Sequence, residues 1–177
     1  MYLNCHSYYS LRYGTMAPET LIREAANKGI EALALTDINN STGMVDFVRL
    51  CRERGIHPVA GIEFRQGDRY LYTGIARNNE GFRELNEFLT YHQESGLPFP
   101  VTAPPARQVW FIYRMDRIPQ RTLKEHELIG VAPGDINRLH TGFQKNDQSR
   151  YVILQPVTML TTEDYTLHTH LRAIGHN

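Results

Sequence analysis

Three side chains that commonly bind divalent metals, His6, Asp37 and Glu63, stand at or just after the ends of predicted strands. One imidazole and two carboxylates are a reasonable donor set for a divalent cation, which can activate water against a phosphoester. Open α/β sheets and barrels both place functional sites at the carboxyl ends of their strands. These residues are therefore the candidate metal site, with Mn²⁺, Zn²⁺ or Mg²⁺ as the candidate ion.

Each of the three residues also has a purely structural interpretation. His6 could tie down the loop after the first strand through a hydrogen bond. Asp37 is well placed to cap the turn that follows it, or the helix behind that turn. Glu63 could instead pair with a neighbouring arginine, either Arg65 or Arg69. The residues alone leave both interpretations open.

The first half of the chain alternates between predicted strands and helices joined by short loops. Strands are predicted at 1–4, 32–36, 57–64 and 69–76, and helices at 18–28, 44–54 and 79–92. The run ALALT at 32–36 is almost entirely apolar, which is typical of a buried parallel strand. The alternation predicts an α/β fold with a parallel sheet or barrel.

The second half of the chain is less regular. Residues 94–108 contain four prolines and predict a surface connection. Strands are predicted at 109–113, 128–132 and 151–154, and helices at 135–140 and from about 163 to 174, the last capped by Thr162. His168 and His170 are two apart on that last helix, so they cannot form a metal pair, and we expect both to be solvated or capping. Residues 1–177 are predicted to form one domain, made of a regular part (1–93), the connection (94–108) and a less regular part (109–177).

The overall composition excludes several classes of protein. The chain has 19 Lys and Arg residues against 19 Asp and Glu residues, so its net charge is close to zero. We therefore do not expect the surface as a whole to bind nucleic acid. Only two cysteines occur, Cys5 and Cys51, which favours reduced thiols in a cytoplasmic protein. The start of the chain does not resemble a signal peptide, and no apolar run approaches the roughly 20 residues that span a bilayer. The sequence predicts a cytoplasmic protein that does not bind membranes.

A series of short motifs runs through the same chain. They read NCHSYYS at 4–10, ALTDI at 34–38, GIE at 61–63, GIARNNEGF at 74–82 and TED at 162–164. In this order they resemble the PHP domain at the N-terminus of bacterial DNA polymerase III alpha subunits, which carries His-x-His-Ser, Leu-Thr-Asp-His and Gly-x-Glu. The resemblance is strong over about residues 2–90, patchy to 150 and recognisable again from about 151. It implies an irregular (β/α)7-type barrel, shortened or incomplete in this chain.

Several positions depart from the metal-ligand pattern of that family. Ligand histidines or aspartates of the family correspond here to Asn4, Ile38, Leu71 and the segment 156–158. His6, Asp37 and Glu63 are what survives, and a cluster of two or three metals needs many more donors. The resemblance therefore implies a PHP fold whose catalytic centre has decayed, with no confident catalytic residue and at most one divalent metal.

The resemblance also implies a role in DNA replication. The parent protein would be a DNA-directed DNA polymerase, a nucleotidyltransferase, and this domain would have no activity of its own. Its partners would be the remainder of the polymerase alpha chain and the proofreading exonuclease subunit, with DNA contacted only through the holoenzyme. Two alternatives stay open. One is a weak metal-dependent phosphoesterase that uses the residual ligands, and the other is a standalone phosphate- or nucleotide-binding module that uses Asn4, His6, Asn39 and Asn40.

Overall fold

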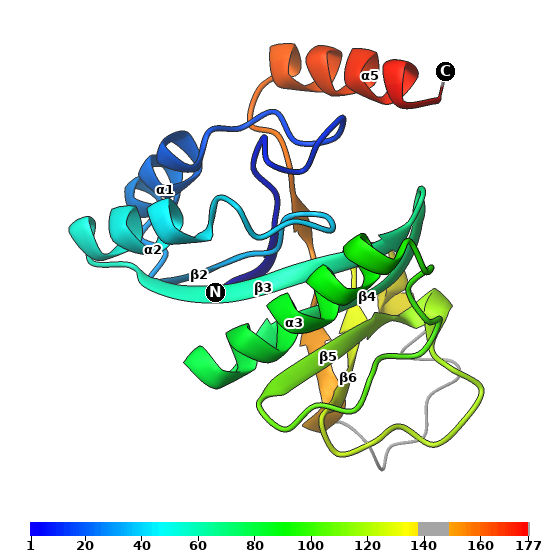
Figure 1. Cartoon of the computed structure of the whole chain (residues 1–177). Helices are drawn as coiled ribbons and strands as arrows, with labels where there is room; N and C mark the ends of the chain where they lie inside the picture. The colour runs from blue at the N-terminus through cyan, green and yellow to red at the C-terminus, as the bar shows by residue number, and fades with distance from the viewer. Residues whose placement is uncertain (138–148, 177) are drawn as a thin grey trace.

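The computed structural model describes residues 1–137 and 149–176, which form one mixed sheet with the first three helices on its outer side and the last helix across one end (Figure 1). The strands are β1 (Tyr2–Cys5), β2 (Ala32–Leu35), β3 (His57–Gln66), β4 (Arg69–Ala76), β5 (Val109–Arg114), β6 (Glu127–Val131), β7 (Tyr151–Ile153) and β8 (Pro156–Val157). The α-helices are α1 (Pro18–Asn27), α2 (Met44–Glu53), α3 (Asn79–Ser95) and α5 (Thr162–His176). No helix among these residues is long and apolar enough to cross a membrane.

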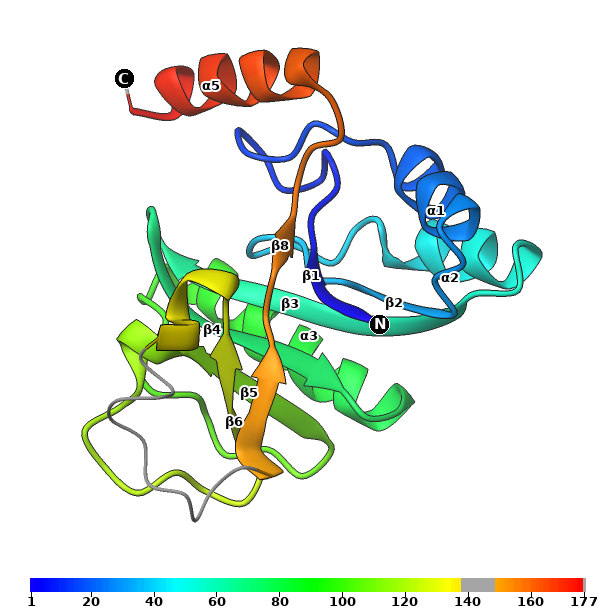
Figure 2. The same ribbon diagram turned by 180° about the vertical axis from the view of Figure 1, so that it is seen from behind.

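The sheet is strongly curled, and its two edge strands, β7 and β8, follow one another directly in the sequence. The strand order is β7-β6-β5-β4-β3-β2-β1-β8, and only Leu154 and Gln155 separate β7 from β8. Backbone hydrogen bonds of 2.9 Å from Leu154 N to Val131 O and from His6 N to Val157 O extend the two pairings. The bent segment 151–157 therefore runs from β6 on one side to β1 on the other (Figure 2). This arrangement confirms the predicted α/β, barrel-like fold.

The strand direction reverses at β4. β1, β2 and β3 are parallel, as the alternation with α1 and α2 predicts. β4 is antiparallel to both β3 and β5, so the sheet as a whole is mixed. The reason is the connection: β3 passes to β4 through a tight turn in which Gly67 has φ of 57°. Such a turn reverses the chain, whereas a parallel pairing needs a long crossover.

Most predicted elements are confirmed, with differences at their ends. α3 extends to Ser95 and stops at Gly96, which has the left-handed conformation of a helix C-cap. The connection at 94–108 contains no strand, as its prolines predict. The short strand β8 is an addition that the sequence pattern did not indicate. Half of the helix predicted at 135–140 lies outside the described residues, which show a 3₁₀ turn at Pro133–Asp135 followed by helical residues at 136–137.

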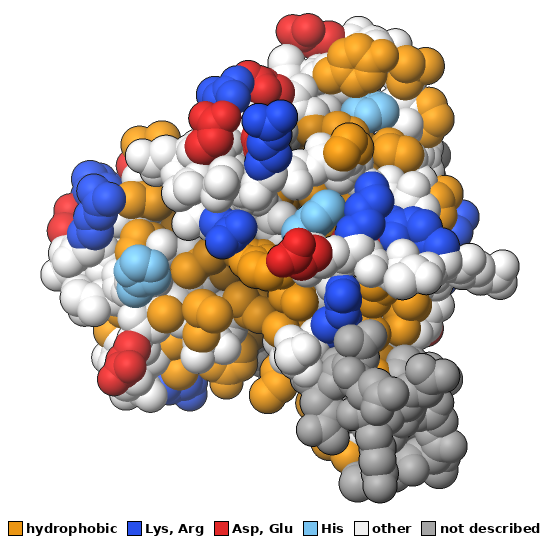
Figure 3. All heavy atoms as spheres, turned by 90° about the horizontal axis from the view of Figure 1, so that it is seen from below, with side chains coloured by type: hydrophobic (Ala, Val, Ile, Leu, Met, Phe, Trp, Pro, Cys, Tyr) orange, Lys and Arg blue, Asp and Glu red, His pale blue; other side chains and the backbone are white. Residues whose placement is uncertain are grey.

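Four apolar clusters lie among the described residues, and three of them hold the sheet and the helices together. One packs α1 and α2 against the outer face of β1 and β2, and a second packs α3 against the outer face of β3, β4 and β5. The third takes residues from most strands and so fills the inside of the curled sheet; its buried members are Ala34, Tyr70, Ile75, Ile112 and Leu154. Hydrophobic side chains also gather on the surface at the end opposite α5 (Figure 3). The other end, where the parallel strands finish, carries the polar site.

Candidate functional site

β1 and β3 bring His6 and Glu63 into direct contact inside the barrel. His6 Nε2 lies 3.2 Å from Glu63 Oε2, and the two side chains are only 0% and 1% exposed. The other ring nitrogen, Nδ1, lies 3.1 Å from Thr158 Oγ1, just after β8. Both nitrogens of His6 therefore already have partners within the protein, which ties the end of β1 to β3 and β8.

Glu63 is surrounded by donors from three sides. Arg65 Nε donates to Glu63 Oε1, and Asn4 Nδ2 donates to Oε2 over 3.0 Å. The predicted pairing of Glu63 with an arginine is thus confirmed for Arg65. The guanidinium of Arg65 also lies 4.4 Å from the centre of the Tyr13 ring, a cation–π arrangement. A fixed positive charge therefore neutralises this buried carboxylate.

Acid is expected to destabilise the protein through Glu63. Burial, the largest influence, raises the pKa of Glu63, but His6 and Arg65 together outweigh it and lower the pKa from 4.5 to about 2. Because the folded pKa lies below the unfolded one, the stabilisation by this carboxylate is present above the unfolded pKa and is lost as the pH falls through the folded pKa. Urea unfolding at several pH values should show this loss. Substituting Glu63→Gln should remove that part of the pH dependence, and an unchanged acid profile would contradict the assignment.

Asp37 binds the loop after β1 instead of the turn that follows it. Its oxygens accept hydrogen bonds of 2.7 Å from Ser7 N, Ser7 Oγ and Ser10 Oγ. Ser10 Oγ in turn accepts from the backbone N–H of Ile38. The predicted capping of the adjacent turn is therefore wrong, because the serines of the loop lie closer to the carboxylate than the backbone beyond it. The side chain of Asp37 is 1% exposed, so these bonds form away from solvent.

His6, Asp37 and Glu63 do not fit a metal ion in this arrangement. His6 has a partner at each nitrogen, and both carboxylates accept hydrogen bonds at both oxygens. Within residues 1–137 and 149–176, no group of three or more His, Cys, Asp and Glu side chains is placed to hold one. Metal binding by these three residues stays a prediction that only a measurement of bound metal can test.

The positions that depart from the family pattern have taken structural roles. Asn4 donates to Glu63 and accepts from Thr36 Oγ1 over 2.8 Å, and Thr158 holds His6. Leu71 is buried in the apolar cluster on the outer face under α3. The neighbouring Tyr70 faces inward instead and donates its hydroxyl to Ile112 O over 2.7 Å. At Asn4 and Thr158 the interior is held by hydrogen bonds between protein groups.

α5 is attached to this site through Tyr13. His168 Nδ1 lies 2.6 Å from Tyr13 O, and the two rings meet edge-to-face at 4.8 Å. Arg172 adds an ion pair of 2.6 Å with Asp68. The expectation that His168 is solvated or capping is therefore wrong. The contact joins residues 155 positions apart, so spacing along the chain carries no signal for it.

A cavity of about 460 Å³ opens beside the buried network. Asn4, Glu63, Arg65, Tyr70 and Arg114 are among the residues that line it. The sequence analysis did not identify Arg114 as a candidate. It is the last residue of β5, and its position at a strand end was the signal that could have identified it. The lining combines positive and negative side chains, so its charges largely compensate one another.

The four residues proposed for nucleotide binding do not converge on this cavity. Asn4 lines it, and His6 is enclosed behind it. Asn39 exchanges hydrogen bonds with the backbone of Arg65, and Asn40 donates to Tyr9 O. The two later asparagines therefore shape loops and do not offer their amides to a ligand.

Comparisons of this chain with protein-family models and with individual proteins agree with one another. The model of the PHP domain family matches residues 3–155. An error-prone DNA polymerase of Symbiobacterium thermophilum is 40% identical over 90 residues, which cover 51% of this chain and 8% of that protein. The DNA polymerase III subunit alpha of Escherichia coli K12 is 30% identical over 118 residues, covering 63% of this chain and 10% of that protein. The chain thus spans about a tenth of the length of these relatives.

One solved structure with a similar chain path comes from Bacteroides vulgatus. It is a two-domain protein described as containing a predicted PHP-like metal-dependent phosphoesterase. The sequences are 13% identical, the TM-score is 0.47, and the match covers 74% of this chain and 43% of that one.

Proposed function

Because the chain belongs to the PHP domain family and is homologous to DNA polymerase III alpha subunits, we propose that it is a structural and interaction module of a replicative polymerase. In this proposal residues 1–177 act as one domain that has lost metal-dependent catalysis. The parent protein is a DNA-directed DNA polymerase of the cytoplasm. Its partners are the remainder of the alpha chain and the proofreading exonuclease subunit, and DNA is reached through the holoenzyme.

One observation supports the part of the proposal that concerns the loss of catalysis. The donor atoms of His6, Asp37 and Glu63 are all engaged by protein groups, and Arg65 supplies the positive charge that Glu63 requires. A metal would have to displace a buried guanidinium and break several buried hydrogen bonds. Each broken buried bond leaves a polar group without a partner, which costs about 1–3 kcal/mol. The protein network therefore competes directly with a cation for the same oxygens.

Loading the purified chain with Mn²⁺ or Zn²⁺ tests the proposal. After gel filtration, elemental analysis is expected to find less than about 0.1 metal ion per chain, because a working three-donor site would retain such ions measurably. Hydrolysis of bis(4-nitrophenyl) phosphate should not exceed that of chelator-treated protein. A metal stoichiometry near one that is lost in the Glu63→Gln variant, together with hydrolysis, would favour the weak phosphoesterase instead.

A further inference from the structure

The layer of outer helices has a gap between α2 and α3. α1 and α2 follow β1 and β2, but β3 passes directly to β4, so no helix covers the beginning of β3. Figure 1 shows β3 running between α2 and α3. A groove of about 480 Å³ lies there. Pro58 and Ala60 of β3 line it together with Val45 and Val48 of α2 and Phe82 of α3.

The groove is apolar and open to solvent. Val45 is 79% exposed, although a valine on a helix that faces a sheet would normally be covered. Val48, Pro58 and Phe82 are only partly buried. Contiguous exposed apolar surface with a polar rim is characteristic of interaction sites in soluble proteins. The exposed apolar surface between α2 and α3 is therefore available to a segment of another protein.

The charges around this groove are of one sign. Its lining includes Arg52, His57 and Arg77 and contains no Asp or Glu. Among the described residues neither Arg52 nor Arg77 forms an ion pair; Arg77 lies over the Trp110 ring at 5.3 Å. Arg49 on the same helix, in contrast, binds Glu53 and Asp46. Two guanidinium groups are therefore free to meet carboxylates beside an apolar surface.

We propose that this groove binds a segment of a partner protein that presents apolar side chains flanked by carboxylates. The apolar walls take the anchoring side chains, and Arg52 and Arg77 take the carboxylates at the two rims. An amphipathic helix suits the gap, since the neighbours on both sides are helices lying over the same sheet. The area is small, so we expect a Kd of about 10–100 µM. The proposal does not depend on the loss of metal chemistry.

Fluorescence anisotropy with two labelled peptides tests the proposal on the 177-residue chain. The first peptide is an amphipathic helix with leucines on one face and glutamates beside them, and the second has lysine in place of each glutamate. The glutamate peptide is expected to bind about 5- to 30-fold more tightly, because two rim ion pairs contribute about 1–2 kcal/mol together. Equal binding of the two peptides, or no binding of either below about 1 mM, would overturn the proposal.

Three variants locate the binding, each verified by far-ultraviolet circular dichroism. Val45→Asp should abolish binding of the glutamate peptide without unfolding the exposed helix face. Arg52→Glu combined with Arg77→Glu should reverse the preference in favour of the lysine peptide. Arg49→Gln, the matched control on the same helix, should leave both affinities unchanged. Peptide binding that is unchanged by Val45→Asp would overturn the proposal. Self-association in sedimentation equilibrium that Val45→Asp abolishes would also overturn it, because the groove would then bind a second copy of the chain.

Discussion

Replacing Arg65 with methionine is expected to lower the free energy of unfolding by about 3–5 kcal/mol, the range for breaking one side of a buried ion pair. Glu63 is 1% exposed and Arg65 11% exposed, so solvent can replace little of what the guanidinium provides. Methionine keeps much of the arginine stem and its contact with the Tyr13 ring, so the substitution removes mainly charge and hydrogen bonds. Urea unfolding at neutral pH, followed by circular dichroism, measures the change.

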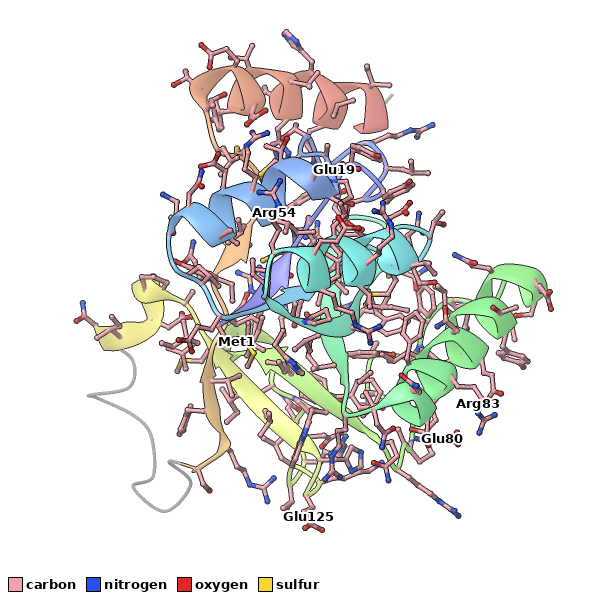
Figure 4. All side chains as sticks on the ribbon, turned by 90° about the vertical axis from the view of Figure 1, so that its left-hand side faces the viewer. Met1, Glu19, Arg54, Glu80, Arg83 and Glu125 are labelled. Carbon is pink, nitrogen blue, oxygen red and sulfur yellow. The ribbon has the colours of Figure 1, made fainter. Side chains whose placement is uncertain are left out.

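A matched control and a rescue separate charge from packing in this experiment. Arg83 pairs with Glu80 and Glu87 on α3, but these side chains are more than half exposed. Glu80 and Arg83 lie on the outer side of the molecule (Figure 4), so Arg83→Met should change the stability little. Adding Glu63→Gln to Arg65→Met should restore part of the lost stability, since the amide carries no charge. Equal effects of Arg65→Met and Arg83→Met would contradict the buried-pair account.

The Arg65 experiment bears directly on the proposal that this chain has lost metal-dependent catalysis. A carboxylate at the end of β3 can be neutralised by a bound cation or by a side chain of the protein. In this chain Arg65 is two residues further along the same strand, so its side chain lies on the same face of the sheet as Glu63. The guanidinium then provides permanently the positive charge that a metal would provide reversibly. Under the proposed function, stability therefore depends on this internal ion pair and not on a supply of metal.

The sequence predicted the elements around the site better than the contacts inside it. The apolar runs and helix ends identified β1 to β4 and α1 to α3, because local periodicity determines them. The strand-end rule selected His6 and Glu63, which do meet. The antiparallel direction of β4 was missed, although the turn at 67–68 carried the signal: its shortness forbids a crossover.

Contacts between distant segments had no comparable signal. Thr158 reaches His6 from 152 positions away, and His168 reaches Tyr13 from 155. Whether such residues meet depends on how far the sheet curls, which the pairing of β8 with β1 decides. Arg65 is the intermediate case. The sequence left Arg65 and Arg69 as two options. The structure selects Arg65, because a spacing of two on a strand places both side chains on one face, while Arg69 stands beyond the turn.

Replacing Asp37 with alanine is the second change with a large expected effect, a loss of about 3–5 kcal/mol in unfolding free energy. Three donors from Ser7 and Ser10 would lose their acceptor in a region closed to water. The loop after β1 contains Tyr13, on which α5 is docked through His168. Loosening this loop should therefore also release α5, which hydrogen exchange can report separately from global unfolding.

Graded variants decide whether Asp37 acts through these hydrogen bonds. Ser10→Ala removes one of the three donors to Asp37 and should destabilise the protein less than Asp37→Ala, while Asp37→Asn should fall between the two because the amide keeps one acceptor. Asp46→Ala is the matched control, since Asp46 is 59% exposed and, among the described residues, its ion pair is a long one of 3.5 Å with Arg49. If Asp37→Ala unfolds the chain outright, the order of Ser10→Ala and Asp37→Asn still tests the account. An Asp37→Asn variant as stable as the wild type would show that the negative charge of Asp37 does not contribute to stability. It would contradict the account that Asp37 acts through charged hydrogen bonds to the loop.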